Sequence, residues 1–275
     1  MNRTMEYSIA GNPDGPTLVF IHGWPDDASL WRQQVTALAP DYRCVLLTLP
    51  NFGRTPEKAG GFDFPELVAR MAATIRDEGG RATAAACDVT DPAAREALVR
   101  TAVEAYGRIT ILVNNAGGGG PKPFDMPMSD MRLAFELNLF SVFRLCQLAA
   151  PHMQSAGGGV ILNISSMAGE NRNRRMAAYG ASKAAESHLT RNIAFDLGPL
   201  NIRVNAIAPG ATRTPALARV LTPEIEEAML RHTPLKRLGE PDDMANAALF
   251  LCSPAASWIS GQILTVSGGG MQELD

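Results

Sequence analysis

Three residues, Ser166, Tyr179 and Lys183, have the types and spacing needed to move a proton. Ser166 follows an apolar run, and Tyr179 precedes Lys183 by four positions, so on a helix both would lie on one face. A free tyrosine titrates near ~10, and a neighbouring ammonium favours the phenolate and so eases proton exchange at neutral pH. With a serine hydroxyl to hold the reacting oxygen, this group predicts acid–base chemistry on an alcohol or ketone.

Other polar residues follow apolar runs elsewhere in the chain. They are Asp88, the segment Asn114-Asn115-Ala116-Gly117, Asn138 within Glu-Leu-Asn-Leu, and Pro209-Gly210 followed by Thr214. Together with the first three residues, they resemble the short-chain dehydrogenase/reductase family, in which a Ser, Tyr, Lys and Asn tetrad transfers protons beside NAD(P). A Tyr and a Lys four positions apart would be weak evidence for this family on their own, and the pair gains weight from the other residues around it.

The resemblance assigns roles residue by residue. It implies a catalytic group of Ser166, Tyr179, Lys183 and Asn138. It implies cofactor-binding residues at Asp88, Asn114, Ala116, Gly117, Tyr179, Lys183, Ile207 and Thr214. The substrate would contact Ser166, Asn171 and Tyr179, although Asn171 fits a solvated loop equally well. No histidine or cysteine spacing predicts a metal site.

From about residue 108 onward the chain is similar to the bacterial 7α-hydroxysteroid dehydrogenases, a group within this family. The similarity rests on NNAGGGGPKPFDMPMSD, TPEIEEAMLRHTPLKRLGEP and LFLCSPAASWISGQILTVSGGG. It implies oxidation of the 7α-hydroxyl of a bile-acid steroid, or the reverse reduction, with NAD slightly favoured over NADP. It also implies a homotetramer and a flexible substrate cover over residues 212–232. The wall of the substrate site would include Met176, Ala216, Leu217 and Val220, although each also fits ordinary packing.

Alternating apolar runs and amphipathic stretches predict the elements that position these residues. Strands are expected at 18–21, 44–49, 82–89, 111–114, 160–165, 202–208 and 263–266. Helices are expected at 27–39, 64–78, 91–106, 128–153, 178–197 and 241–252, two of them with Pro starts. The pattern is typical of an α/β doubly wound parallel sheet in three layers, a Rossmann-like single domain over 1–275, with ligands at the carboxyl ends of the strands.

The first quarter of the chain departs from this pattern. Residues 1 to about 70 resemble the start of an α/β-hydrolase, through GPTLVFIHGWPDDASLWRQQVTAL and LPNFGRTPEK, whereas 75–275 form the dehydrogenase core. The glycine-rich turn that would hold a pyrophosphate is replaced by His22-Gly23-Trp24-Pro25, followed by Asp26 and Asp27. Arg54 would suit a 2′-phosphate but also fits an exposed loop. Two alternatives therefore stay open: a catalytically silent fusion that binds cofactor weakly or not at all, and a residual hydrolase, although no Gly-x-Ser-x-Gly elbow is present.

The two resemblances compete for one sheet edge. In hydrolases the strand here at 5–9 pairs with the strand here at 44–49, whereas in dehydrogenases the strand at 82–89 takes that edge. We expect 82–89 to occupy it and 5–9 to be displaced.

Composition limits the remaining classes of function. The net charge of −3 gives no reason to expect nucleic acid or an anionic membrane as a partner. The N-terminus lacks an apolar signal core and no stretch approaches the ~20 apolar residues of a membrane span. We therefore expect a cytoplasmic protein with a small-molecule, steroid-like substrate.

Overall fold

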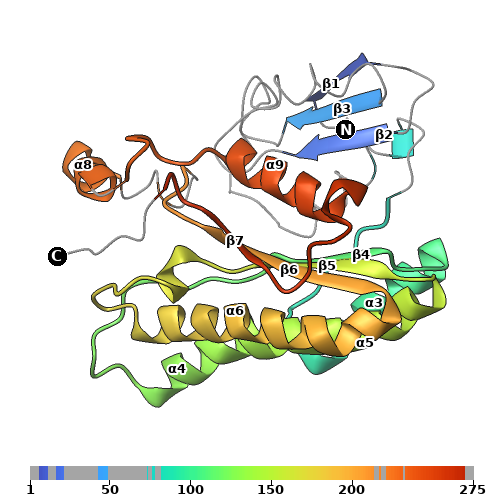
Figure 1. Cartoon of the computed structure of the whole chain (residues 1–275), viewed down its shortest axis with the longest axis horizontal. Coiled ribbons are helices and arrows are strands. Elements are labelled where there is room, and N and C mark those ends of the chain that lie inside the picture. Colours follow the sequence, from blue (N-terminus) through green and yellow to red (C-terminus); the bar gives the residue numbers. More distant parts are fainter. Residues whose placement is uncertain are drawn as a thin grey trace, which may run out of the picture. The chain divides into compact units, whose positions relative to one another are not determined.

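The computed structural model describes residues 6–11, 17–21, 43–48, 73, 76–77, 82–213, 217, 221–231 and 233–269 (Figure 1). The chain divides into two compact units. One comprises Met1–Ala86 with Thr214–Val220, and the other comprises Cys87–Arg213 with Leu221–Asp275. The expectation of a single domain over 1–275 stays a prediction.

The N-terminal unit contains a sheet of three described strands in the order β1-β3-β2. They are β1 (Glu6–Gly11), β2 (Thr17–Ile21) and β3 (Arg43–Thr48). β2 is parallel to β3, as expected for strands predicted at 18–21 and 44–49. The predicted helix at 27–39 and most of that at 64–78 lie outside the described residues.

The prediction for the edge of β3 was wrong. β1 pairs antiparallel with β3, from Glu6 opposite Thr48 to Gly11 opposite Arg43, and residues 82–88 form no strand. Two physical factors favour this outcome. The segment 82–89 contains four alanines and an aspartate, residues depleted in strands, and an antiparallel pair is slightly more stable per residue than a parallel one. The hydrolase-like pairing therefore prevails at this edge.

The C-terminal unit is built on a parallel sheet in the order β4-β5-β6-β7. The strands are β4 (Ile111–Asn114), β5 (Gly159–Ile164), β6 (Ile202–Pro209) and β7 (Ile263–Val266). All four were predicted, with bounds that differ by at most one residue at either end. The described strands form two hydrogen-bonded sheets where the sequence predicted one. Within the C-terminal unit the arrangement is Rossmann-like.

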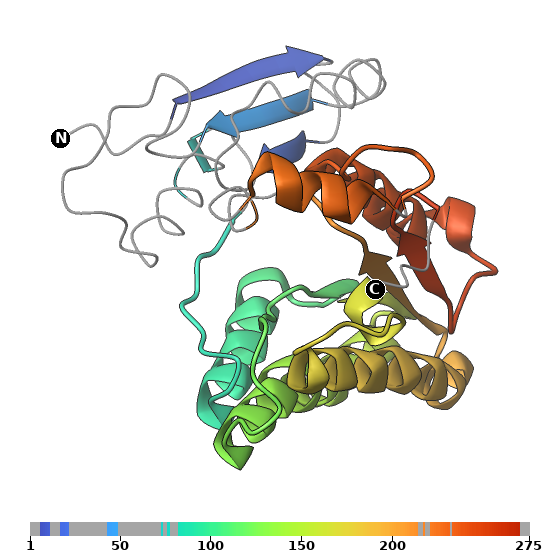
Figure 2. The ribbon, with the colours of Figure 1, turned by 90° about the vertical axis from the view of Figure 1, so that its left-hand side faces the viewer.

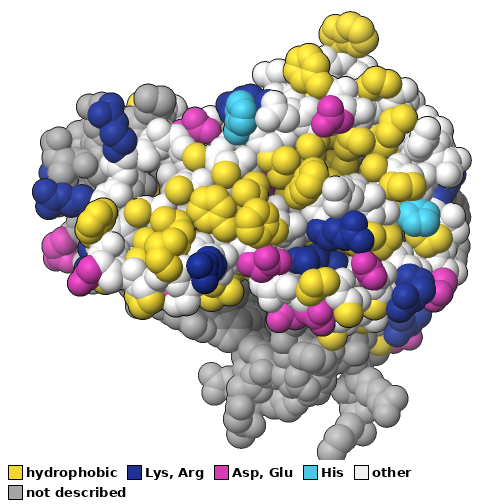
Figure 3. Space-filling view, turned by 90° about the horizontal axis from the view of Figure 1, so that it is seen from below, with side chains coloured by type: hydrophobic (Ala, Val, Ile, Leu, Met, Phe, Trp, Pro, Cys, Tyr) yellow, Lys and Arg dark blue, Asp and Glu magenta, His cyan; other side chains and the backbone are white. Residues whose placement is uncertain are grey.

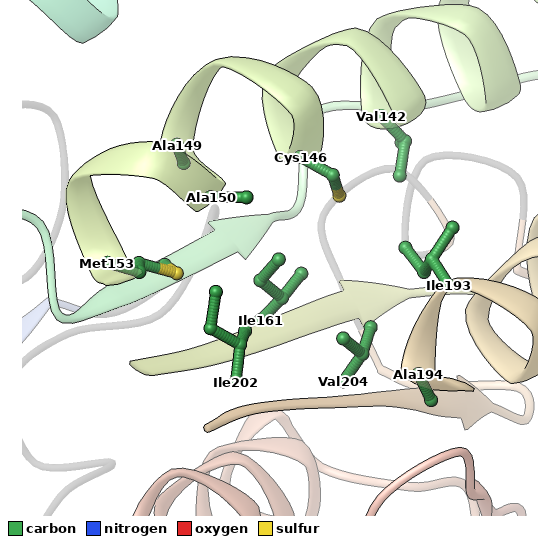
Figure 4. Packing of buried hydrophobic residues seen from close by; sticks show 10 residues of the cluster. All are labelled: Val142, Cys146, Ala149, Ala150, Met153, Ile161, Ile193, Ala194, Ile202 and Val204. Carbon is green, nitrogen blue, oxygen red and sulfur yellow. The ribbon is translucent and has the colours of Figure 1, made fainter. Parts of the chain in front are cut away.

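Helices cover both faces of this sheet (Figures 1 and 2). On one face lie α5 (Ser141–Ser155) and α6 (Ala177–Leu197), whose apolar side chains pack against Ile161, Ile202 and Val204 (Figure 4). On the other face lies α9 (Pro241–Cys252), which packs through Leu251 against Leu162 and Ile207. Successive strand residues thus point to opposite layers, as a sheet buried on both faces requires.

Two helices begin within one residue of where their proline starts predicted. The side chain of Asp91 accepts a hydrogen bond from the amide of Ala93 at the start of α3 (Pro92–Tyr106), which packs beside α5. Glu240 and Asp243 form a capping box at the start of α9. Helix α8 (Pro223–Arg231) was not predicted, because its residues had been assigned to a flexible cover.

The predicted helix at 128–153 is continuous but changes pitch. It consists of α4 (Met128–Phe135), the π-helix η2 (Glu136–Phe140) and α5. Contrary to the sequence expectation, Met128–Ser155 is long and apolar enough, by length and composition, to cross a membrane. Its α5 part supplies Val142, Cys146 and Met153 to the core on the sheet, so we interpret it as a core helix.

Candidate active site

The predicted catalytic residues come from elements that meet at the carboxyl ends of β4 and β5. Gly117 lies in the loop after β4, and Ser166 follows β5. Tyr179 and Lys183 lie in the first two turns of α6, and Asn138 is the central residue of η2. Carboxyl ends of parallel strands are where α/β sheets bind ligands, and a single π-turn inside a helix is frequent at functional sites.

Lys183 is buried and its ammonium is held on two sides. Its Nζ donates to the carbonyl oxygen of Ile164 at 2.8 Å and to Oε2 of Glu186 at 2.7 Å. An ammonium carries three N–H donors, so, among the residues that the structure describes, one is left for a ligand. A methyl group added to Gly117 would lie 3.1 Å from this Nζ. The space in front of the ammonium therefore exists because residue 117 has no side chain.

Asn138 is fully buried and fixed through both ends of its amide. Its Oδ1 accepts from the amide of Gly118 at 2.9 Å, and its Nδ2 donates to the Gly118 carbonyl and to Oγ of Ser182, each at 3.0 Å. The hydroxyl of Ser182 donates in turn to the carbonyl of Tyr179 at 2.8 Å. Asn138 thus ties the loop after β4 to the turn of α6 that carries Tyr179.

Tyr179 is half-buried and its ring lies against Gly119. A Cβ placed on Gly119 would approach Cδ2 of the tyrosine to 2.6 Å, so a side chain at 119 would displace the ring. A cavity of about 260 Å³ adjoins the ring and is lined largely by apolar residues. They include Leu133, Ala134, Leu137 and Ala178. The cavity suits an apolar molecule that presents an oxygen to a phenol.

Ser166 is brought to α6 by the short 3-10 helix η3 (Met167–Gly169), at whose start it lies. Its Oγ accepts from the amide of Ala168 at 3.1 Å. The close approach of η3 to α6 requires Gly169 and Gly180, since an added Cβ would lie 2.7 Å from Ala184 N and 2.8 Å from Ala168 O, respectively. Ser165, the residue before Ser166, is buried. Its Oγ donates to the Lys183 carbonyl at 3.0 Å and lies 2.8 Å from the hydroxyl oxygen of Ser187.

Besides Lys183, two predicted cofactor residues have buried side chains. Asn114 donates through Nδ2 to Oδ1 of Asn163 at 2.9 Å, and Asn163 donates to Oγ1 of Thr190 at 2.9 Å. The side chain of Ile207 is fully buried against α9, and its carbonyl accepts from the amide of Ser165. These contacts tie the sheet to its helices, and a cofactor role for either residue stays a prediction.

The remaining predicted residues are more exposed. Asp88 accepts from the amide and the hydroxyl of Thr90 at 2.8 and 2.7 Å, and these bonds lower the pKa of its carboxyl. Ala116 and Gly117 are exposed, and Asn171 is half-buried. Thr214 lies outside the described residues. The structure thus brings Asn138, Gly117, Tyr179 and Lys183 together, with Ser166 carried on the segment packed against α6.

Sequence reasoning missed Glu186 and Ser182. Glu186 is fully buried beside Lys183, and Ser182 links Asn138 to the backbone of Tyr179. Both lie near the Tyr-x-x-x-Lys pair, at spacings that place them on adjoining faces of the same helix. A carboxylate three residues after a candidate catalytic lysine was a signal that could have been noticed.

The residues at the nicotinamide end fit the cofactor that the resemblance implies. Among the described residues, the Lys183 ammonium has one N–H left to donate, and a Cβ at Gly117 would fill the space beside it. Both features suit a ribose hydroxyl beside Tyr179. At the pyrophosphate end the sequence has one glycine, Gly23, followed by Trp24 and Pro25, where the family has a glycine-rich turn. The fit is therefore good at one end of the cofactor and poor at the other.

Comparison with known proteins agrees with this geometry. A family model described as enoyl-(acyl carrier protein) reductase matches residues 62–271. The chain therefore belongs to the short-chain dehydrogenase/reductase family and is an oxidoreductase of that family. A second model, described as the α/β hydrolase fold, matches residues 16–85, in agreement with the resemblance of the first quarter.

Two relatives and one solved structure show which members of this family the chain is similar to. The chain is 65% identical over 201 residues to the 7alpha-hydroxysteroid dehydrogenase of Escherichia coli (strain K12), covering 73% of this chain and 79% of that protein. It is 37% identical over 210 residues to the 7alpha-hydroxysteroid dehydrogenase of Bacteroides fragilis, covering 74% and 80%. A solved 7α-hydroxysteroid dehydrogenase complexed with NADH and 7-oxo glycochenodeoxycholic acid superposes with a TM-score of 0.73 at 62% identity, covering 77% of this chain and 83% of that one.

Proposed function

We propose that this protein transfers a hydride between NAD(P) and C7 of a bile-acid-type steroid, which interconverts the 7α-hydroxyl and the 7-ketone. The observation that carries the proposal is the grouping of Asn138, Tyr179 and Lys183 beside an apolar cavity. The solved relative that holds NADH and a 7-oxo bile acid supports this choice of cofactor and substrate. NAD is favoured slightly over NADP by the same relative.

In this proposal Tyr179 handles the proton. Its hydroxyl gives a proton to the substrate carbonyl in reduction, and its phenolate takes one from the alcohol in oxidation. The hydroxyl of Ser166 holds the same substrate oxygen, and the ammonium of Lys183 favours the phenolate. Asn138 keeps the loop after β4 against α6 through Gly118 and Ser182. When bound, NAD(P) supplies or accepts the hydride.

The remaining cofactor and substrate contacts are proposed from the resemblance. Asp88, Asn114, Ala116, Gly117, Ile207 and Thr214 would line the cofactor, and Asn171 would contact the steroid. We further propose a cytoplasmic homotetramer.

A direct experiment titrates the full chain with NADH and NADPH and then follows cholate oxidation. We expect binding weaker than is usual for the family, because Asp26 and Asp27 would repel a pyrophosphate where the family has glycines. Tyr179→Phe should abolish turnover and leave nucleotide binding largely intact. Absence of binding of either nucleotide at millimolar concentration would contradict the proposal.

A second candidate is a catalytically silent fusion that keeps the dehydrogenase fold. It is favoured by the hydrolase-type pairing of β1 with β3 and by the absence of the glycine-rich turn from the sequence. Nucleotide titration followed by cholate oxidation separates the two candidates, because a silent fusion binds NADH and NADPH weakly or not at all and turns over no cholate.

A further inference from the structure

Glu186 is a buried acid that the proposed reaction does not use. Its side chain has 0% exposure, and its Oε2 lies 2.7 Å from Nζ of Lys183 in a buried ion pair. Its second oxygen, Oε1, has no hydrogen-bond partner among the described residues. A carboxylate buried with one oxygen unsatisfied is costly, so its contact with the lysine calls for a physical account.

The pair is held in a defined geometry. The ammonium of Lys183 also donates to the carbonyl of Ile164 at 2.8 Å, so the end of β5 and Glu186 together fix its position. One turn further along α6, the hydroxyl of Thr190 donates to the backbone carbonyl of Glu186 at 2.9 Å. The carboxylate thus occupies one of the three donors of the lysine and directs the remaining one.

We propose that Glu186 is a positioning residue for Lys183, which fixes the ammonium at the end of β5 and sets how much of its positive charge acts on the Tyr179 hydroxyl. The inference rests on the proposed function, in which Tyr179 handles the proton. The physical basis is that a negative charge in contact with the ammonium offsets the field that the ammonium exerts one helical turn away.

The surroundings of Glu186 make its own charge responsive to pH. Burial raises the pKa of Glu186 to about 7, against the lowering effect of Lys183 in the same helix. From α5, the thiol of Cys146 lies close enough to feel this carboxylate, and burial raises the pKa of that thiol to about 12, so it stays uncharged. Lys183 is the charged group of the described residues that acts on the carboxyl. Ionisation of Glu186 near neutrality therefore changes the charge beside Lys183.

The test replaces the acid by its amide. Glu186→Gln keeps an oxygen for the lysine and removes the negative charge, so the full lysine charge should act on Tyr179. We expect the tyrosinate of residue 179 to form at lower pH by about one unit. The readout is the ultraviolet difference titration of each protein against the same protein carrying Tyr179→Phe, which isolates one tyrosine from the four in the chain and requires no turnover.

Two further variants separate positioning from structure. Glu186→Asp keeps the charge and should restore the titration of the parent. Thr190→Val removes two buried hydrogen bonds one turn along the same helix, the one donated to the Glu186 carbonyl and the one accepted from Asn163, and should lower stability without moving the titration. Where the protein turns over cholate, the acid limb of kcat should move with the tyrosinate curve, while KM for the steroid changes by less than about twofold.

The outcomes distinguish this inference from the proposed function. A Glu186→Gln titration that coincides with the parent, or an equal displacement in Thr190→Val, would overturn the role of Glu186. Turnover that persists in Tyr179→Phe would instead overturn the proposed function, and the titration would still decide whether Glu186 acts on residue 179.

Discussion

At the scale of single residues, the site depends on glycines, which leave space, as much as on its polar side chains. Gly117 leaves space at the ammonium of Lys183 and beside Oδ1 of Asn138, and Gly119 leaves space for the ring of Tyr179. The Tyr–Lys pair and Asn138 could be predicted from the sequence because their motif is local. The spacing of Glu186 from Lys183 was a signal for a pair, but its burial could not be predicted, because a charged residue at a buried helical position contradicts the polar-outside pattern on which sequence reasoning relies.

Gly117→Ala tests the space in front of Lys183. The new Cβ would lie 2.9 Å from Oδ1 of Asn138. The side-chain amide of Asn138 makes three hydrogen bonds in all, so it cannot move freely. We expect kcat/KM to fall about 10–100-fold, since small displacements of catalytic groups have effects of this size. The control is Gly198→Ala, because Gly198 has φ −52 and no atom within 4 Å of an added Cβ. Equal activity of the two variants would refute the steric argument.

The buried carboxyl of Glu186 should also make the free energy of unfolding depend on pH. Burial raises the pKa of its carboxyl in the folded chain from 4.5 to about 7. The stabilisation from the neutral acid is thus complete below about 4.5 and is lost as pH rises through about 7. We expect the free energy of unfolding to fall by on the order of 1–3 kcal/mol over this range, relative to Glu186→Gln. Urea denaturation of both proteins at several pH values measures the difference, and parallel curves would contradict it.

At the scale of elements, local signals predicted what local interactions determine. The bounds of β4 and β7 and the starts of α3 and α9 follow from short apolar runs and from capping residues. The partner of β3 depended on which of two distant segments pairs with its edge. Neither alternation nor capping decides such a competition, and the alanine content of 82–89 was the one relevant signal.

Arg203 of β6 joins the sheet to the end of α9. Its guanidinium donates to the carbonyl oxygens of Leu251, Ser253 and Ile259 at 2.9, 3.3 and 3.3 Å, so it satisfies two acceptors at the end of α9, from Leu251 and Ser253, and one in the loop beyond it. We expect Arg203→Met to lower the free energy of unfolding by about 1–3 kcal/mol, as measured by urea denaturation. Arg191→Met, at an exposed position of α6, is the matched control. A loss no larger than in the control would contradict the capping role.

At the scale of the whole molecule, two families meet in one chain. The hydrolase-fold match ends at residue 85 and the dehydrogenase match begins at 62, so they overlap just before the boundary between Ala86 and Cys87. The residues proposed to transfer protons lie wholly in the C-terminal unit, whereas in the family the pyrophosphate turn belongs to the part that the hydrolase-like segment replaces. The sequence revealed this junction because its motifs change from those of one family to those of the other across it.

The C-terminal unit also exposes apolar side chains that bear on the proposed homotetramer. Leu133, Phe140 and Phe143 lie along α4, η2 and α5 and are 60%, 51% and 40% exposed. Figure 3 shows hydrophobic side chains gathered on the face of α4–α6. Exposed apolar surface of this kind is typical of protein–protein contacts, and a self-complementary patch favours a symmetric homo-oligomer.

We therefore expect Phe140→Lys combined with Phe143→Lys to weaken a homotetramer, because each protomer would place two positive charges in an apolar contact. Light scattering after size exclusion should show the mass fall from four protomers toward the 29.4 kDa of one, with unchanged circular dichroism. Phe124→Lys, which alters an exposed residue before α4, should leave the mass unchanged. A parent protein that is already monomeric, or a double variant that keeps the full mass, would show that this face is not the interface.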